Sequence, residues 1–399
     1  MTAPHPQSHD AVLGGKTPVP MGAAVLGGMA GVQQRLQSMS IAAKLKALYE
    51  AASYGDQGLD LILQSLSDPS EQIQHQALSL LWHRTEPKIK SVLAQYSPYQ
   101  LFDIVDTLQG HRDAITTLAM SPNGKLLFSA GADCWVKVWG LVGDRQGQLL
   151  GNLHGHTQPI TSIAISNHGK FLATGSRDKT IKIWHIPTGK LLLTLSGHIG
   201  YVNSVAITPD DRYLISGSQD TTIKLWDLQT GAELKTLHGH TSLVDSVALS
   251  PDGKAIASCS WDTTIKVWDL TSSEKRWEFI GHSARVLSFA ISPDGRTLAS
   301  GSLDTRIMIW DLHTGQKVRT LEGHWGWVKS LVISRDGKTL ISASYKEIRV
   351  WSLATGKLIQ VLNGHINLIN AIALSQDGQT LVSGGEDRQI HIWQVPPLQ

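Results

Sequence analysis

A Gly-His pair recurs along the chain at nearly constant intervals, and this repeat limits the possible folds more than any other feature. The pairs begin at positions 110, 155, 197, 239, 281, 323 and 364, so that successive pairs are 41 to 45 residues apart. A tryptophan follows each histidine by 28 residues, or by 27 in the sixth repeat. Such regular self-similarity indicates an architecture in which each repeat forms one supersecondary unit.

Each repeat has the pattern of four short strands. The third reads YVNSVAITPDDRYLISGSQDTTIKLWDLQTGAELKTL (201–237), in which apolar, β-rich runs alternate with Pro-Asp, Asp and Thr-Gly turns. Runs of this length joined by tight turns predict a four-stranded antiparallel meander. One such sheet cannot bury both of its faces, so seven sheets are expected to pack around an axis. The predicted fold is mainly β, a closed seven-bladed β-propeller preceded by a small α-helical region.

The repeats resemble those of the WD-repeat β-propeller family over residues 102 to about 395. The resemblance is carried by the Gly-His pairs, by segments such as SGSQDTTIKLWD, and by Trp-Asp pairs that begin at positions 226, 268 and 310. In that family each blade holds a buried hydrogen-bonded tetrad of a His, a strand Ser or Thr, a turn Asp and a strand Trp. The matching residues here are His111, Ser129, Asp133 and Trp139; His156, Thr174, Asp178 and Trp184; His198, Ser216, Asp220 and Trp226; His240, Ser258, Asp262 and Trp268; His282, Ser300, Asp304 and Trp310; His324, Ser342 and Trp351; and His365, Ser383, Asp387 and Trp393.

Recurring Ser, His and Asp residues also suggest a catalytic triad, but a catalytic set is needed once and this set occurs seven times. We therefore interpret the tetrads as structural. The sixth repeat departs from the pattern, because SYKEIRVW (344–351) is one residue shorter than SLDTRIMIW (302–310) and lacks the turn Asp. His324 is thus expected to lose its acceptor and the turn to be the least stable of the seven. Glu347 is an alternative acceptor whose reach the sequence does not decide.

The seventh repeat has three predicted strands, because few residues follow Trp393. The segment 102–108 resembles the runs that precede later Gly-His pairs, and it is expected to supply the missing strand. Closure of the ring in this way would remove exposed sheet edges. The domains expected are therefore a disordered Gly/Pro/Ala-rich lead-in (1–30), an α-helical segment (31–100) and the propeller (101–399).

The helical segment shows apolar residues at helical spacing, and GLDLILQSLSDPSEQIQHQALSLLW (58–82) resembles a HEAT-type helix pair. Too few repeats are visible for an independent solenoid. The segment is expected to dock either on the propeller or on a partner. Similar helical segments precede WD repeats in chains of photosynthetic bacteria, which suggests by analogy a bacterial protein.

Bulky side chains collect at two positions of the third to sixth repeats. These positions are the third residue after each His and the residue before each turn Asp, and both are expected on one end of the propeller, the top rim. Trp, Tyr and Arg are enriched at interface hot spots. The predicted partner-binding residues are Tyr201, Leu243, Trp261, Arg285, Leu303, Trp327 and Tyr345, together with Trp325, which directly follows His324. Two alternatives stay open, namely that the rings receive the helical segment or pack on neighbouring turns.

Composition disfavours several classes of function. Lys and Arg number 35 against 33 Asp and Glu, and no basic stripe accompanies the aromatic residues, so a nucleic-acid module is not favoured. Two cysteines are too few for a disulfide framework or a cysteine metal site, and no apolar run is long enough for a transmembrane helix. We expect a cytoplasmic, non-enzymatic scaffold that binds a protein or peptide on the top rim, as an assembly or regulatory factor, without cofactor, metal or small-molecule substrate. A propeller enzyme and a nucleic-acid-binding module are the alternatives.

Overall fold

The computed structural model describes residues 28–93 and 95–395. Its contacts divide the chain into two compact units, with the boundary between Gln95 and Tyr96. This boundary lies slightly before the position expected from the sequence, because Tyr99 and Phe102 are buried in the core of the second unit. The two units are therefore described separately.

The first unit is a small helical domain. Its helices are α1 (Gly28–Leu36), α2 (Ile41–Ala51), α3 (Gly55–Ser65), α4 (Glu71–Trp82) and α5 (Pro87–Leu93). Leu48, Ile62, Ile73 and Leu81 are fully or almost fully buried and form its core. Most of the expected disordered lead-in lies outside the described residues, but residues 28–30 form the first turn of α1, whose Val32 is buried.

The second unit contains seven four-stranded antiparallel sheets, called blades 1 to 7. Blades 1 to 3 comprise β2 (Ile115–Met120), β3 (Leu126–Gly131), β4 (Val136–Gly140) and β5 (Leu149–Leu153); β6 (Ile160–Ile165), β7 (Phe171–Ser176), β8 (Thr180–His185) and β9 (Lys190–Ser196); and β10 (Val202–Ile207), β11 (Tyr213–Ser218), β12 (Ile223–Asp227) and β13 (Glu233–Leu237). Blades 4 to 6 comprise β14 (Val244–Leu249), β15 (Ala255–Ser260), β16 (Thr264–Asp269) and β17 (Lys275–Ile280); β18 (Val286–Ile291), β19 (Thr297–Ser302), β20 (Ile307–Asp311) and β21 (Lys317–Leu321); and β22 (Val328–Ile333), β23 (Thr339–Ser344), β24 (Glu347–Ser352) and β25 (Leu358–Asn363). Blade 7 comprises β26 (Ile369–Leu374), β27 (Thr380–Gly385), β28 (Gln389–Gln394) and β1 (Asp103–Gln109).

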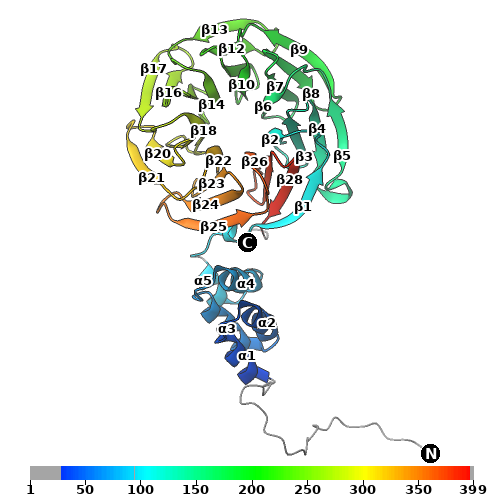
Figure 1. The fold of residues 1–399 in the computed structure, drawn as a ribbon, viewed down its shortest axis with the longest axis vertical. Helices are drawn as coiled ribbons and strands as arrows, with labels where there is room; N and C mark the ends of the chain where they lie inside the picture. The colour runs from blue at the N-terminus through cyan, green and yellow to red at the C-terminus, as the bar shows by residue number, and fades with distance from the viewer. Residues whose placement is uncertain (1–27, 94, 396–399) are drawn as a thin grey trace, which may run out of the picture. The chain divides into compact units, whose positions relative to one another are not determined.

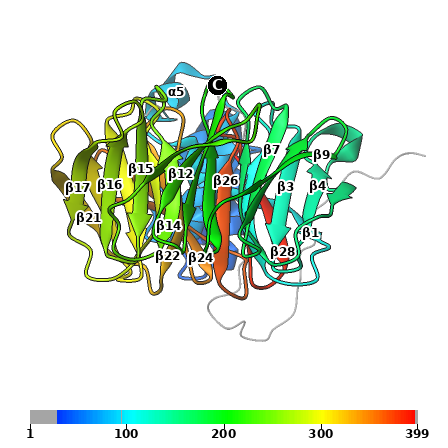
Figure 2. The same cartoon turned by 90° about the horizontal axis from the view of Figure 1, so that it is seen from above.

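The blades stand around a central axis and form a seven-bladed propeller, which confirms the predicted fold class (Figure 1). The first strand of each meander lies nearest the axis and the fourth lies at the periphery (Figure 1). Seen from the side, the ring shows the blades packed next to one another, with their strands running between the two rims (Figure 2). Turns between the second and third strands point to the same rim as the segments after the Gly-His pairs, which is the top rim.

Blade 7 is built from both ends of the propeller sequence. Strand β1 pairs antiparallel with β28, with Leu108 opposite Ile390 and Ile104 opposite Trp393. The two strands lie side by side in Figure 1, where β1 is cyan and β28 is red. The pairing supplies the outer strand of blade 7 and closes the ring.

The core lies between neighbouring blades rather than within a single sheet. Trp226 of blade 3, for example, packs in one cluster with Ala173 and Ile181 of blade 2. The second strand must carry a small residue where two blades approach most closely. A Cβ on Gly217 would lie 2.7 Å from a methyl group of Val244 in blade 4. Cys259 occupies the corresponding position of blade 4, and burial raises the pKa of its thiol, which is consistent with a packing role.

Removal of β1 should open the ring. We expect a chain that lacks residues 1–109 to expose the edge of β28 and to be poorly soluble, because unpaired strand edges template aggregation. A chain that lacks residues 1–95 keeps β1 and should give a folded propeller. Size-exclusion chromatography and thermal melting of both variants test the prediction, and a stable monomer from the longer deletion would contradict it.

Candidate functional site

Each tetrad is a chain of hydrogen bonds that runs from the third strand to the top rim. In blade 3 the Trp226 indole N–H donates to Ser216 Oγ at 2.8 Å, and this hydroxyl lies 2.7 Å from His198 Nε2. His198 Nδ1 lies 2.8 Å from Asp220 Oδ2. A neutral imidazole that carries its proton on Nδ1 satisfies every atom of this chain, and we assign that tautomer from the network.

In six blades the turn Asp is the last member of this series of hydrogen bonds. Its Oδ2 lies 2.7 to 2.9 Å from the His Nδ1 in each of them. The same oxygen accepts the backbone N–H of the residue after the His at 3.0 to 3.2 Å. Burial alone would raise the pKa of Asp220, but hydrogen bonds from His198 and Thr222 hold the pKa well below its usual value. The carboxylate thus joins two segments of the top rim.

Blade 6 lacks this carboxylate. His324 Nε2 still lies 2.7 Å from Ser342 Oγ, but its Nδ1 has no hydrogen-bond partner. The nearest acid, Glu347, places Oε1 3.4 Å from Nδ1 and accepts a hydrogen bond from Arg349 Nε at 2.7 Å instead. Burial, with a smaller contribution from the positive charge of Arg349, lowers the pKa of His324 to about 3. Glu347 therefore approaches the vacant position without replacing the Asp.

The top turn of blade 6 also has a different set of hydrogen bonds from the others. In blade 4 the N–H of Trp261 donates to the carbonyl of Leu243 at 3.1 Å, and the other five blades with a turn Asp have an equivalent bond. Between the described residues Tyr345 and Trp327 no such bond is found. Ser344 Oγ is buried without a partner. The shortened turn has other contacts instead, because Glu347 pairs with Ser344 in the ladder and the Tyr345 carbonyl accepts the N–H of Ile369 at 2.7 Å.

Three aromatic side chains surround this turn on the surface. Trp325 is 87% exposed, Trp327 is 50% exposed and Tyr345 is 50% exposed. The glycine between the two tryptophans lies against Tyr345, since a Cβ on Gly326 would be 3.2 Å from the Tyr345 Cβ. Trp325, Trp327 and Tyr345 therefore form one exposed group, named the blade 6 aromatic cluster.

The other expected binding residues lie on the same rim but are not equally free. Arg285 is exposed and stacks on Trp261, with its guanidinium carbon 3.6 Å from the ring centroid. The Trp261 indole N–H also donates to Asp245 Oδ1 at 3.2 Å, so this ring is held by its own chain. Tyr201 is exposed on blade 3. Leu243 and Leu303 are partly buried in blades 4 and 5.

Several rim residues were missed by the sequence reasoning. Ile199 and Ile366 are exposed at the position that Trp325 occupies in blade 6, directly after the tetrad His. Reading that position in every repeat would have found them. No bulky rim residue was expected in blade 1, but Trp135 lies there. Its ring centroid is 5.1 Å from the guanidinium carbon of Arg112 and 4.9 Å from the Lys137 amine. Trp135 follows the turn Asp, a position that was not compared.

A partly buried acid and a partly buried amine on inner strands were also missed. The fifth residue after each His donates to a backbone carbonyl of the next blade in blades 1, 2, 3 and 7, through Thr116, Thr161, Asn203 and Asn370. Asp245 and Lys329 take this position in blades 4 and 6. Burial raises the pKa of Asp245 to about 6, and burial lowers the pKa of the Lys329 amine. Lys329 donates to Asn370 Oδ1 at 2.9 Å.

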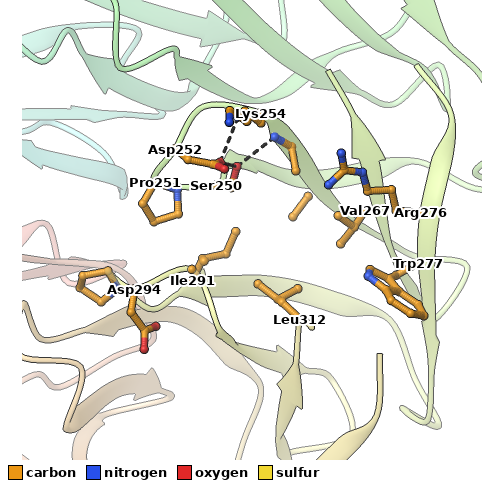
Figure 3. A pocket seen from close by; sticks show the side chains of 14 residues that line it. Ser250, Pro251, Asp252, Lys254, Val267, Arg276, Trp277, Ile291, Asp294 and Leu312 are labelled. Carbon is orange, nitrogen blue, oxygen red and sulfur yellow. Dashed lines mark hydrogen bonds between the residues drawn. The ribbon is translucent and has the colours of Figure 1, made fainter. Parts of the chain in front are cut away.

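A pocket of about 490 Å³ lies on the opposite rim between blades 4 and 5 (Figure 3). Val267, Ile291, Leu312 and Trp277 supply much of its apolar lining. The Asp252 carboxylate accepts hydrogen bonds from Ser250 Oγ and the backbone N–H of Lys254, at 2.5 and 3.1 Å. These polar groups fix the local turn and are not arranged as a nucleophile with its base.

One group of potential metal ligands occurs among the described residues, namely His365, Asp387 and His391, whose ligand atoms lie within 4.8 Å of one another. His365 already uses Nδ1 for Asp387 at 2.7 Å and Nε2 for Ser383 at 2.8 Å. His391 Nδ1 lies 2.8 Å from the hydroxyl of Thr107 on β1. The group is therefore the blade 7 tetrad with one additional histidine, and its hydrogen bonds do not leave three free ligands.

Comparison with known proteins agrees with this geometry. The family model described as "WD domain, G-beta repeat" matches residues 102–140, 147–185, 189–227, 231–269, 273–311, 315–352 and 356–394, which together exceed half of the chain. A search of curated proteins finds no match. None of the helices in the described part of the chain has the length and hydropathy of a membrane-spanning segment.

Hydrogen exchange should show that the top turn of blade 6 opens more readily than that of blade 3. The amide of Gln219 donates to Tyr201 at 2.8 Å, whereas the Tyr345 amide lacks the equivalent bond. One lost hydrogen bond of about 1 kcal/mol corresponds to roughly fivefold faster exchange. Equal protection of the two amides, measured by mass spectrometry or NMR, would show that the shortened turn is as stable as the others.

His324 should also make stability depend on pH. Its pKa is about 3 in the folded protein and ~6.5 in an unfolded chain. Between these values the unfolded chain binds a proton that the folded protein does not, so acidification favours unfolding. Lowering the pH from about 7.5 to about 5 should cost about 2 kcal/mol through this residue. Urea titrations at both pH values measure the loss, which should be smaller by that amount in His324→Gln; equal losses would contradict the assignment.

Proposed function

Because the chain belongs to the WD-repeat family, we propose that it is a non-enzymatic scaffold that binds a protein or peptide partner on the top rim of its propeller. Propellers of this family generally act as protein-interaction scaffolds. We further propose a role as an assembly or regulatory factor in the cytoplasm, where two free cysteines, one of them partly exposed, are compatible with a reducing environment. A bacterial source remains part of this proposal.

The observation that carries the proposal is the exposure of Trp325, Trp327 and Tyr345 at one turn. Tryptophan and tyrosine bury large apolar areas with little loss of side-chain entropy, and tryptophan is among the residues most enriched at hot spots. A side chain that helps to pack a blade is buried, as Trp351 is in the same sheet. Trp325 is instead almost completely in solvent. The cluster therefore has the composition of an interface and not of a core.

Other blades add exposed apolar side chains to the same rim. Tyr201 and Ile199 lie on blade 3 and Ile366 lies on blade 7, and Arg285 stacks on Trp261. Exposed apolar patches on a monomer commonly mark interaction sites. Mixed aromatic, aliphatic and guanidinium groups are suited to a folded protein surface or a peptide. Nucleic acid is not favoured, because Lys and Arg exceed Asp and Glu by only two residues, 35 against 33.

The helical unit of the same chain is the alternative occupant of this surface. Its removal tests this directly, because residues 96–395 retain every strand of the propeller. If the helices cover the cluster, removal of residues 1–95 should change the emission of Trp325 and Trp327 as well as remove that of Trp82, and only the loss of Trp82 should remain in Trp325→Ala/Trp327→Ala. If a separate partner binds there, removal of the helices should subtract the emission of Trp82 alone from both proteins.

The double variant Trp325→Ala/Trp327→Ala should keep the melting temperature and lose partner binding. A buried tryptophan replaced by alanine costs about 3–5 kcal/mol of stability, whereas exposed hot-spot residues cost about 2–4 kcal/mol of binding. Trp277→Ala is the matched control, since Trp277 is also exposed but lies on the outer strand β17.

The measurements are thermal melting and affinity capture from extracts of the source cell, followed by calorimetry with the purified captured protein. The control should bind as the wild type does. A large fall in melting temperature with binding retained would show that the two rings are packing residues and that the top-rim site is wrong.

A further inference from the structure

The six complete tetrads show what the turn carboxylate does at the top rim. In blade 5, Asp304 Oδ2 lies 2.8 Å from His282 Nδ1 and accepts the N–H of Ser283 at 3.0 Å. Its Oδ1 accepts the turn N–H of Arg306 at 3.0 Å. One carboxylate thus satisfies an imidazole and two backbone amides, and it is itself almost fully buried. The same arrangement recurs in blades 1, 2, 3, 4 and 7.

Blade 6 presents the donors of this arrangement without the acceptor. The His324 side chain is only 1% exposed, and its Nδ1 has no hydrogen-bond partner. No acceptor for the backbone N–H of Trp325 is found among the described residues, whereas the equivalent N–H is bonded to the Asp in the other six blades. A buried polar group without a partner is costly, so this position favours an acceptor oxygen.

Glu347 does not supply that oxygen. Its Oε1 accepts the Arg349 Nε–H at 2.7 Å and lies 3.4 Å from His324 Nδ1, outside the length of a normal hydrogen bond. Glu347 begins β24, directly opposite Ser344, so the backbone register restricts its approach to the turn. The acceptor position of the tetrad is therefore approached by Glu347 but not filled.

Two basic side chains lie near the position, although one of them, Arg349, already pairs with Glu347. Burial and, to a smaller extent, the positive charge of the Arg349 guanidinium lower the pKa of His324. The Lys346 amine lies 5.2 Å from the Tyr345 ring centroid, in the same turn. An incoming carboxylate would thus be attracted to this part of the rim. Three exposed rings surround it, so a partner bound to them would bring its own side chains close.

We propose that an Asp or Glu side chain of the partner fills the acceptor position of blade 6 and completes its tetrad between two chains. This inference rests on the proposed function, since the acidic residue belongs to the protein that binds the top rim. The carboxylate accepts hydrogen bonds from His324 Nδ1 and the Trp325 N–H, as Asp304 does from His282 and Ser283. Access requires the Tyr345–Lys346 turn to move. That turn lacks one hydrogen bond present in the other blades, and the Tyr345 carbonyl accepts the N–H of Ile369 at 2.7 Å, a bond that must break or shift.

An inserted Asp provides the sharpest test. Insertion between Tyr345 and Lys346 gives SYDKEIRVW, which has the length and the Asp position of SLDTRIMIW in blade 5. The inserted carboxylate should complete the tetrad within the chain and exclude that of a partner, while all three aromatic residues remain. Lys346→Asp places a carboxylate in the turn without insertion and serves as the second variant if the insertion does not fold.

Acetate is the first probe. In NMR spectra of the protein with labelled histidine, acetate should shift the His324 imidazole signals of the wild type saturably and leave the other six tetrad histidines unchanged. Those six signals also report whether each variant is folded. The insertion should abolish the shift, and Glu347→Gln, the matched control, should retain it. Absence of a His324 shift, or a shift with inorganic phosphate and none with acetate, would overturn the inference.

A random dodecapeptide library is the second probe, and it is selected on the wild-type protein. Peptides that lose binding to Trp325→Ala/Trp327→Ala bind the top rim. Among these, an acidic residue should recur, and its change to Asn or Gln should weaken binding to the wild type at least tenfold. The insertion variant should bind the acidic peptide more weakly than the wild type does, by a similar factor. In the insertion variant, the change of the acidic residue to Asn or Gln should not weaken binding further. This non-additivity indicates that both changes remove the same interaction.

The outcomes separate this inference from the proposed function. Peptides that require the aromatic cluster but carry no required acidic residue would support the top-rim site and overturn the completed tetrad. If selection yields no peptide that depends on the cluster, neither the proposed function nor the inference is supported, and an absent acetate shift would then overturn the inference independently.

Discussion

The hydrogen bond between a buried imidazole and a turn carboxylate is the interaction on which the top rim depends. It ties the segment after each Gly-His pair to the turn between the second and third strands, and the Ser and Trp of the same tetrad extend it into the sheet. Charge-assisted hydrogen bonds that are removed from water are stronger than those at the surface. Six repetitions of this bond give the rim a rigid frame, on which exposed side chains vary without altering the fold.

The proposed binding site lies at the one blade that departs from this frame. Blade 6 keeps His324, Ser342 and Trp351 and their mutual hydrogen bonds, so the body of its sheet is intact. The missing turn residue affects only the upper end, where an acceptor is absent and three aromatic rings nearby are exposed. Departures from a local rule within an otherwise consistent fold are expected at functional sites.

Most contacts within one blade could be predicted from the sequence, including the pairing of β1 with β28, whereas side-chain contacts between blades could not. The tetrads and strand order follow from fixed spacings, because each depends on residues close in the chain. Trp261 and Trp325 are both predicted rim tryptophans, yet Trp261 is held by Asp245 and Arg285 from two different blades. The position of Glu347 likewise depends on whether Arg349 competes for it, which spacing does not reveal.

Binding of a carboxylate at the acceptor position of blade 6 would also stabilise the turn above it. The sheet of blade 6 holds the donors at His324 and Trp325 in place without the missing carboxylate. In the six other blades, donors in the same arrangement bind a carboxylate. Because the turn above it lacks a hydrogen bond, a ligand that supplies the acceptor would also stabilise the turn, and binding to the folded state alone raises its stability. The shortened repeat is therefore better understood as a propeller turn whose last residue can come from another chain than as a degenerate repeat.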